Sequence, residues 1–244
     1  MTNALIKKLG NFSKLSKEDE KAIQRLCTNI VRKKAGEDLI REGERPGSVH
    51  LLLDGWAFRY KHLPDGGRQI LAYLIPGDIC DMHIFVLRQM DHSIGLLNDA
   101  VIGLLSEDAM LELLSRHPAV ERALWWATLV DEAVLREWLA NIGRRDPYRR
   151  IAHLLCEMWV RMSTIGLVSG QDSFSLPLTQ AELGDTVGLT PVTVNRVIQE
   201  LRSDDLIILK EKRLTVRDVS RLMKVSEFDV SYLHLGNADI TRAE

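Results

Sequence analysis

The chain has 244 residues, of which 45% are hydrophobic and 27% are charged. This balance is that of a soluble globular protein and excludes a disordered or collagen-like chain, and the length fits one large domain or two of ordinary size. No apolar run reaches the roughly 20 residues that cross a bilayer, and the first residues lack the apolar block of a signal peptide. We therefore expect a cytoplasmic protein without a membrane partner.

The net charge of −2 is unevenly distributed along the chain. Residues 1–143 carry 18 basic and 20 acidic side chains, residues 144–225 carry 13 and 10, and residues 226–244 carry 1 and 4. A basic excess confined to one segment indicates a part that binds a polyanion, and a solvated basic face is the alternative interpretation.

The first half of the chain changes from a helical to a strand-rich pattern. Apolar residues at helical spacing predict a helix over residues 16–31, with Ser16 as its N-cap. From about residue 34 to residue 105, glycines separate short apolar runs. Residues 64–67 (PDGG) predict a hairpin turn, because proline presets φ and glycine permits a positive φ. Many short strands at this spacing predict a small antiparallel sandwich or barrel.

A long helix is predicted after this region. Ser106 marks one helix start, and Pro118 opens a longer helix that we expect to end at Gly143. Apolar residues occur on more than one face of this helix, so it must bury two sides. One side can cover the β-domain, and the other favours the same helix of a second copy; a core helix of one larger domain is the alternative. The predicted dimer interface is the stripe Leu124, Leu135, Trp138 and Ile142, with Trp125, Trp126 and Leu129 beside it.

The segment over residues 178–203 predicts a helix-turn-helix. Thr179 and Glu182 have the spacing of a capping box, which satisfies two backbone N–H groups at a helix start. Gly188 permits the left-handed turn that ends this first helix. Thr190 then caps a second helix, so two short helices meet at a tight glycine turn.

The second of these helices has an outer face suited to a major groove. An arginine can donate two hydrogen bonds to guanine, and asparagine or glutamine can pair with adenine. Two strands follow, over residues 207–210 and 214–216, and basic residues at their turn can contact phosphate. A purely structural helical hairpin would explain the caps but not this combination. The predicted DNA-contacting residues are Thr179, Gln180, Thr190, Val192, Thr193, Asn195, Arg196, Gln199, Lys212 and Arg213.

The order of these parts resembles the Crp/Fnr family of bacterial transcription regulators. The resemblance depends on residues 178–202 (LTQAELGDTVGLTPVTVNRVIQELR) and, more weakly, on residues 75–78 (IPGD). It implies an α+β fold with a jelly-roll-like β-roll sensor domain, a long dimerisation helix and a C-terminal winged helix-turn-helix. It also implies a homodimer on a palindromic double-stranded DNA operator, with recognition helices about 34–36 Å apart, and contact with RNA polymerase. The predicted boundaries are 1–115 for the sensor, 116–145 for the dimerisation helix and hinge, 146–225 for the DNA-binding domain and 226–244 for a C-terminal extension.

One recognition position departs from the family pattern. Arg196 matches the guanine-contacting arginine of the family, and Thr193 matches a phosphate-contacting position. Many members carry glutamate where Val192 stands. Valine accepts no hydrogen bond but can contact a thymine methyl group. We therefore expect an operator that differs from those of the best-known relatives.

The sensor also departs from the pattern of cyclic-nucleotide-binding relatives, which use an Arg-Ser pair to hold the cyclic phosphate. Residues 91–93 (DHS) stand where that pair is expected, and Asp91 would repel a phosphate. We expect weak or no cyclic AMP binding, and the effector stays unidentified. The candidate effector-contacting residues are Asp81, His83, Arg88, Asp91, His92 and Ser93.

Cofactor chemistry is only weakly indicated. Cys27, Cys80 and Cys156 are too far apart for a disulfide framework, a zinc site or an iron–sulfur cluster, so we expect reduced and mostly buried thiols. Cys80, His83 and His92 permit a haem hypothesis, although a lone histidine is more often structural. The alternative function is accordingly a haem- or small-ligand-binding sensor that acts mainly through protein–protein contacts.

Catalysis is not expected. The sequence has no Ser/His/Asp order, no paired carboxylates in a glycine frame and no phosphate-binding loop, so we predict no catalytic residue, no metal site and no enzyme activity. A sensor ligand would instead bias a hinge near residues 143–147. The final 19 residues contain Phe228, Tyr232, Leu233 and Leu235, which are apolar enough to pack on the DNA-binding domain.

Overall fold

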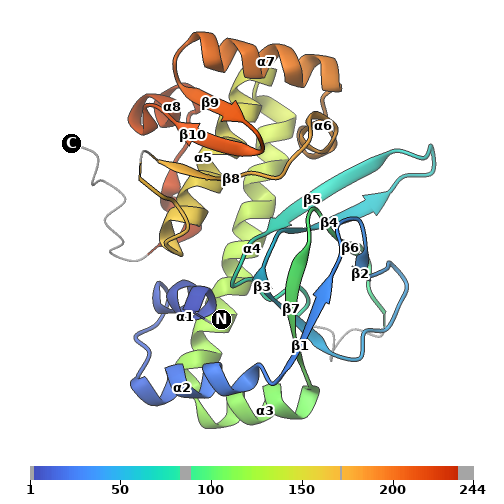
Figure 1. The fold of residues 1–244 in the computed structure, drawn as a ribbon, viewed down its shortest axis with the longest axis vertical. Helices are drawn as coiled ribbons and strands as arrows, with labels where there is room; N and C mark the ends of the chain where they lie inside the picture. The colour runs from blue at the N-terminus through green and yellow to red at the C-terminus, as the bar shows by residue number, and fades with distance from the viewer. Residues whose placement is uncertain (1–2, 83–88, 171, 236–244) are drawn as a thin grey trace. The chain divides into compact units, whose positions relative to one another are not determined.

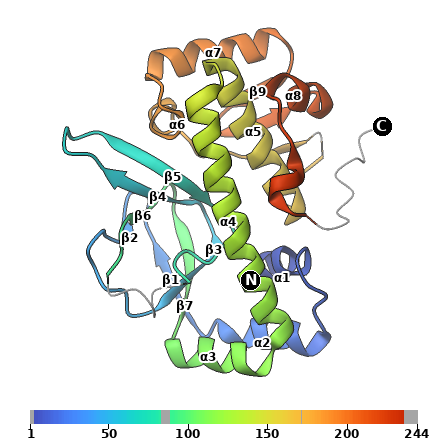
Figure 2. The same cartoon turned by 180° about the vertical axis from the view of Figure 1, so that it is seen from behind.

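The computed structural model describes residues 3–82, 89–170 and 172–235. The chain divides into two compact units, Met1–Thr128 and Leu129–Glu244. Helix α4 (Pro118–Arg144) spans the division, and Figures 1 and 2 show it as one long helix. In the described part of the chain, no helix is long and apolar enough to cross a membrane.

The first unit combines two antiparallel sheets with short helices (Figure 1). Its described strands form a three-stranded sheet in the order β1-β7-β3 and a four-stranded sheet in the order β2-β6-β4-β5. The predicted antiparallel β-roll is therefore confirmed. The elements are α1 (Asn3–Gly10), α2 (Lys17–Leu26), β1 (Asn29–Lys33), β2 (Asp38–Ile40), β3 (Val49–Asp54), β4 (Ala57–His62), β5 (Arg68–Leu74), β6 (Ser93–Leu96), β7 (Ala100–Leu105) and α3 (Glu107–Arg116).

The predicted hairpin turn joins β4 to β5. The Leu63 N–H donates to the Gly67 carbonyl over 2.8 Å, and Gly66 has a φ of 84°. Positive φ is the conformation for which this position needs glycine. The turn thus fixes the pairing of β4 with β5, in which His62 lies opposite Arg68.

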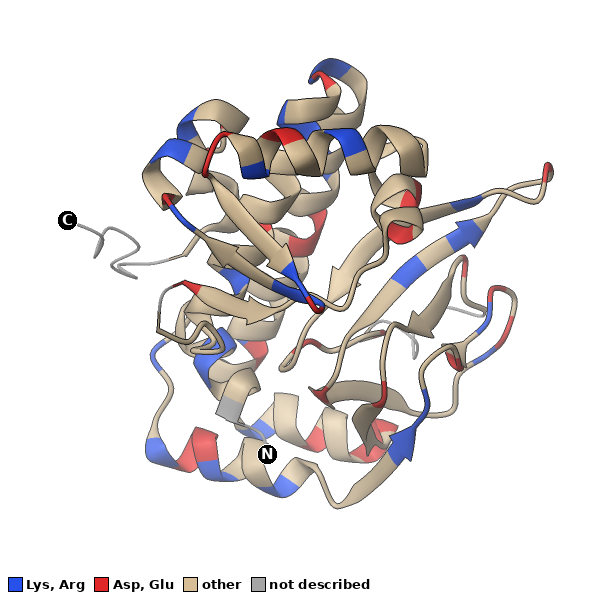
Figure 3. Cartoon of the chain, turned by 45° about the horizontal axis from the view of Figure 1, so that its top comes forward, with Lys and Arg blue, Asp and Glu red and all other residues tan. Residues whose placement is uncertain are grey.

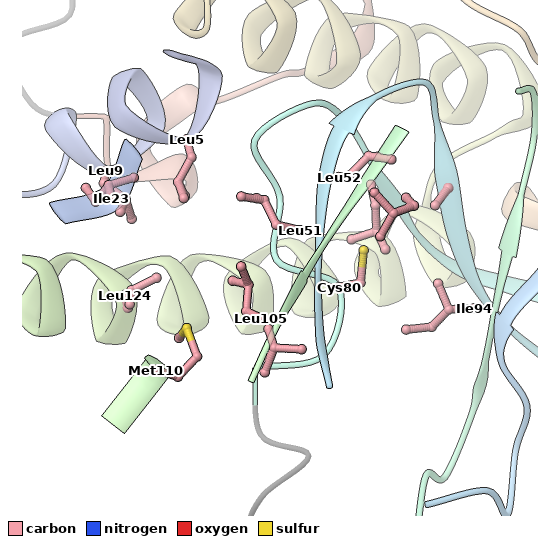
Figure 4. Close-up of a cluster of buried hydrophobic side chains, with 14 of the residues drawn as sticks. Leu5, Leu9, Ile23, Leu51, Leu52, Cys80, Ile94, Leu105, Met110 and Leu124 are labelled. Carbon is pink, nitrogen blue, oxygen red and sulfur yellow. The ribbon is translucent and has the colours of Figure 1, made fainter. Parts of the chain in front are cut away.

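The apolar core of this unit joins the sheets to the helices. Figure 4 shows Leu51 of β3 and Leu105 of β7 near Met110 of α3 and Leu124 of α4. Leu124 is only 4% exposed. Its side chain is buried within the chain's own core, which differs from the exposed position expected of a dimer contact.

The first predicted helix is shorter than expected. Ser16 caps α2, and its hydroxyl accepts from the Asp19 N–H, as predicted. The helix ends at Leu26, however, and Ile30 belongs to β1, where it pairs with Gly103 of β7. The prediction that the helix extends to residue 31 is wrong because Ile30 and its β-branched neighbour Val31 pair in a sheet, although their spacing also fits a helix.

The second unit contains the remaining helices and a small sheet in the order β8-β10-β9. Its elements are α5 (Pro147–Thr164), β8 (Ser173–Ser175), α6 (Gln180–Val187), α7 (Pro191–Ser203), β9 (Ile207–Lys210), β10 (Arg213–Val216), α8 (Val219–Ser226) and the 3₁₀ helix η1 (Val230–Leu233). Three helices followed by a hairpin form the winged helix-turn-helix predicted from the sequence, and the fold class is confirmed.

The corner between α4 and α5 differs slightly from the prediction. Gly143 does not end α4, because the Arg145 N–H still donates to the Asn141 carbonyl over 3.2 Å and the helix continues to Arg144. Asp146 caps α5, as predicted, by accepting from the Arg149 N–H over 3.0 Å.

The faces of α4 also differ from the prediction. Trp138 is 4% exposed and contacts α5, and Ile142 is half-buried, so neither presents the open surface expected of the predicted stripe. Leu135 is 53% exposed, as a dimer contact requires. A group of large apolar side chains is exposed on one side of α4, and we call it the α4 apolar face. Its members are Trp125, Trp126, Leu129, Leu135 and Leu139.

Candidate nucleic-acid interface

The start of α6 has the predicted capping box. The Thr179 hydroxyl accepts from the Glu182 N–H over 3.2 Å, and the Glu182 carboxylate accepts from the Thr179 N–H over 2.7 Å. Gly188 has a φ of 66° and ends α6 in the left-handed conformation. Since both ends of α6 are defined by local interactions, the direction of the chain into α7 is fixed by a few residues.

A second glycine of this turn was not predicted. Gly184 lies inside α6, and a Cβ atom at this position would lie 2.4 Å from the carbonyl oxygen of Leu189. The Leu189 N–H also donates to the Gly184 carbonyl over 3.1 Å. The turn between α6 and α7 therefore packs directly on the backbone at Gly184. A glycine four residues before the turn glycine is the signal that could have revealed it.

Replacing Gly184 with alanine should disrupt this turn. The added methyl group meets backbone rather than a flexible side chain, so we expect a loss of about 1–3 kcal/mol in the free energy of unfolding, together with a loss of DNA binding. Gly143→Ala is the matched control, because a Cβ there has no atom within 4 Å, and a helix gains roughly 0.5–1 kcal/mol from alanine. Urea unfolding of both variants measures the difference. Equal stability of the two variants would contradict the tight contact at Gly184.

Helix α7 buries one side and exposes the other. Thr190 caps it by accepting from the Thr193 N–H over 3.2 Å. The buried side consists of Val194, Val197, Ile198 and Leu201. The exposed side consists of Val192, Asn195, Arg196 and Gln199, as predicted.

The guanidinium group of Arg196 has a neighbour on the same helix. Its Nη1 pairs with Oε1 of Glu200 one turn further along. The two side chains are 58% and 42% exposed. Exposed ion pairs are weak, so Arg196 can exchange this partner for another acceptor at little cost.

The wing hairpin is a two-residue turn rather than the three-residue turn predicted. Arg213 pairs with Lys210 in the sheet, and Glu211 and Lys212 both have positive φ, 51° and 57°. This is the pattern of a type I′ turn. Figure 3 shows Lys and Arg positions on this hairpin and on α7. Lys212 is exposed at the turn.

Arg213 is placed differently from Lys212. Its Nε donates to the Ser173 hydroxyl over 2.7 Å, and its Nη2 donates to the Ser169 hydroxyl over 2.6 Å. These bonds direct its guanidinium group toward β8, so Lys212 is the better placed of the two for phosphate. Thr179 and Gln180 are exposed at the start of α6.

The candidate effector residues of the first unit are mostly engaged by the chain itself. Oδ1 of Asp81 accepts from the His50 N–H over 2.8 Å, and its Oδ2 lies 2.7 Å from His50 Nδ1. The Ser93 hydroxyl accepts from the Glu42 N–H over 2.9 Å. These contacts give Asp81 and Ser93 structural roles. His83 and Arg88 lie outside the described residues.

Asp91 and His92 form a pair near the surface. An oxygen of the largely exposed Asp91 lies 2.7 Å from His92 Nδ1, while His92 Nε2 is buried without a hydrogen-bond partner. Burial lowers the pKa of His92, against the opposing effect of Asp91. Burial also raises the pKa of Cys80 well above its usual range, which disfavours the thiolate that binds metals. Among the described residues, no group of three or more His, Cys, Asp or Glu could hold a metal ion.

A buried polar cluster in the second unit was missed by the sequence analysis. Glu157 of α5 is fully buried, and its Oε2 accepts from Trp138 Nε1 over 2.9 Å and from the Tyr232 hydroxyl over 2.8 Å. Its Oε1 lies 3.4 Å from Nη1 of Arg161. Burial raises the pKa of Glu157, and Arg161 is the main opposing influence. One carboxyl group thus joins α4, α5 and the C-terminal segment.

His153 lies beside this cluster and is fully buried. Its ring centroid is 5.0 Å from that of Phe228 and 6.1 Å from that of Tyr232. Burial lowers the pKa of His153 to about 3, so the ring is neutral at physiological pH. The described part of the C-terminal extension therefore packs on the DNA-binding domain, as expected from its apolar residues.

Comparison with known proteins agrees with this arrangement. A model of the cyclic nucleotide-binding domain matches residues 30–117, and a model of the Crp-like helix-turn-helix domain matches residues 149–225. The transcriptional activator protein FnrL of Cereibacter sphaeroides is 30% identical over 197 residues, which cover 78% of this chain and 77% of FnrL. The nitrogen fixation regulation protein FixK of Bradyrhizobium diazoefficiens is 23% identical over 188 residues, covering 77% of this chain and 78% of FixK.

Solved structures show the same fold. The structure of FixK2 from Bradyrhizobium japonicum has a TM-score of 0.70 at 24% identity and covers 82% of this chain and 98% of that one. A cyclic-nucleotide-binding-type domain followed by a Crp-like helix-turn-helix defines a DNA-binding transcription regulator. The chain belongs to the Crp/Fnr family of transcription regulators.

Proposed function

We propose that this regulator binds a palindromic double-stranded operator as a homodimer and controls transcription there through contact with RNA polymerase. The observation that carries the proposal is the exposed side of α7, with Asn195, Arg196 and Gln199, together with the exposed wing residue Lys212. Side chains on such a face contact base edges, and a basic wing contacts phosphate. The proposal also includes contacts to the phosphate backbone of the DNA, which position the protein on the duplex. The residues predicted for these contacts are Thr179, Gln180, Thr190, Thr193 and Arg213.

The second copy of the chain is proposed to bind at the α4 apolar face. Leu129, Leu135 and Leu139 are 53%, 53% and 73% exposed. A contiguous apolar face of this kind marks an interaction site, and a two-fold interface can use the same face of both copies. Pairing two copies would present two α7 helices to half-sites one turn of DNA apart.

A ligand of the first unit is proposed to modulate operator affinity through the corner near residues 143–147. Cyclic AMP is a poor candidate, since residues 91–93 stand where cyclic-nucleotide-binding relatives carry an Arg-Ser pair, and Asp91 would repel a phosphate group. Operator affinity measured with and without fractions of small molecules from cell extract tests this part. An unchanged affinity with every fraction would remove the ligand switch from the proposal.

Two substitutions should separate base recognition from phosphate contact. Arg196→Ala should cost about 1–3 kcal/mol on the selected operator and relax the preference at one base pair in each half-site. Lys212→Ala should weaken binding to all duplexes and reduce the salt dependence of the affinity. Titrations of fluorescent operator and of a scrambled duplex at two salt concentrations measure both effects.

The matched control for these titrations is Arg116→Ala on α3, where an arginine that is 73% exposed also pairs with a glutamate four residues away. We expect it to bind DNA like the wild type. If Arg196→Ala weakened operator and scrambled duplex equally, the proposed role of α7 in base recognition would be wrong.

A further inference from the structure

We propose that Val192 contacts the 5-methyl group of a thymine close to the guanine that Arg196 contacts. The inference rests on the proposed function and specifies part of the operator. Among the exposed large hydrophobic side chains of the described residues, Val192 has the largest exposed fraction, 80%. Most of this apolar side chain is not covered by the chain itself, and it lies on the side of α7 that is proposed to enter the major groove. Its exposed surface is therefore available for contact with DNA.

The position of Val192 in α7 makes the contact specific. Val192 is the second residue of the helix, after Pro191, and Thr190 caps the same turn. Residues at the N-terminus of a recognition helix are those that contact base edges. Valine in a helix strongly prefers one χ1 rotamer, so its two methyl groups have a defined place relative to the helix axis. The capped first turn therefore holds an apolar group at a fixed point of the surface.

The chemistry of the major groove restricts what this group can contact. The thymine 5-methyl is the apolar feature among the edges of the four bases, and the other groups in the groove are hydrogen-bond donors or acceptors. Valine has neither a donor nor an acceptor, so it cannot satisfy those groups. Thymine is thus the base whose edge matches Val192.

The neighbours of Val192 place this thymine relative to the rest of the site. Val192 and Arg196 are four residues apart on the exposed side of α7, so their Cβ atoms lie about 5–6 Å from each other. Arg196 in turn pairs with Glu200, one turn further from the N-terminus. Val192, Arg196 and Glu200 form a row along the helix. The first two should contact base pairs that are adjacent or separated by one base pair.

The test uses thymine and uracil as probes that differ by a single methyl group. An operator is first selected from a random duplex library with the full-length wild-type chain. Each dT of that operator is then replaced by dU in both half-sites, and the affinity of every duplex is measured. We expect one symmetric pair of positions at which dU weakens wild-type binding about four-fold per half-site, the value of one buried methyl group.

The variant Val192→Ala should lose this sensitivity and bind the dT and dU operators equally, while Arg196→Ala should retain it and lose the guanine preference instead. If no dU position weakens the wild type, or if Val192→Ala remains as sensitive as the wild type, the inference is overturned. Selection of no duplex from the library would instead contradict the proposed function. Val192→Ala shortens an exposed side chain and preserves the helix, so folding does not confuse these outcomes.

Discussion

Leu135→Glu should convert the protein from a dimer to a monomer. Leu135 is 53% exposed on the α4 apolar face, and a charge there would have to be buried without a partner when two copies associate. Because one chain then holds a single half-site, we expect operator affinity to fall by roughly 10²–10⁴-fold. Analytical ultracentrifugation gives the mass, and titration of the selected operator gives the affinity.

Leu111→Glu provides a closely matched control for this prediction. Leu111 of α3 is also 53% exposed but lies outside the α4 apolar face. The control should remain dimeric and retain operator affinity. A Leu135→Glu protein that still sediments with twice the chain mass would place the dimer interface elsewhere.

Glu157→Ala should strongly destabilise the second unit. The substitution leaves Trp138, Tyr232 and Arg161 without their shared acceptor, and removing one partner of a buried charged group costs roughly 3–5 kcal/mol. Hydrogen exchange of α5 backbone amides in the full-length chain reports the free energy of opening. Glu157→Gln should lose less, because an amide oxygen can still accept from Trp138 and Tyr232.

The control for this experiment is Glu112→Ala, which removes an ion pair with Arg116 whose two side chains are 62% and 73% exposed. Exposed pairs contribute about 0–1 kcal/mol, so α5 exchange should hardly change. If Glu157→Ala opened α5 no more readily than this control, the cluster would not stabilise the unit.

The sequence predicted best the parts whose geometry depends on neighbouring residues. The helix-turn-helix and its exposed side were predicted correctly, because the capping and turn residues Thr179, Gly188 and Thr190 interact with residues no more than one helical turn away. The hairpin at residues 64–67 was predicted for the same reason. Caps and tight turns are local interactions, and a sequence window contains all of the groups involved.

The parts that were missed depend on distant partners. Trp138 and Leu135 belong to the same predicted apolar stripe of the long helix. Trp138 is nevertheless buried against α5, where it donates to Glu157, whereas Leu135 is exposed. Asp81 was predicted to contact an effector, but the structure pairs it with His50, which lies 31 residues earlier in the chain. No residue pattern near these positions identifies the partner, since the tertiary fold brings the two together.

The described C-terminal segment has a consequence for how the DNA-binding half can be isolated. Phe228 and Tyr232 cover the neutral ring of His153, and Tyr232 also donates to the buried Glu157. A fragment ending at residue 225, where the helix-turn-helix match stops, would expose both groups to water. Within residues 226–235, Ser226 and Leu233 are buried, at 0% and 2% exposed, and Phe228 and Tyr232 are half-buried. A DNA-binding fragment that keeps these contacts therefore has to extend at least to Leu233.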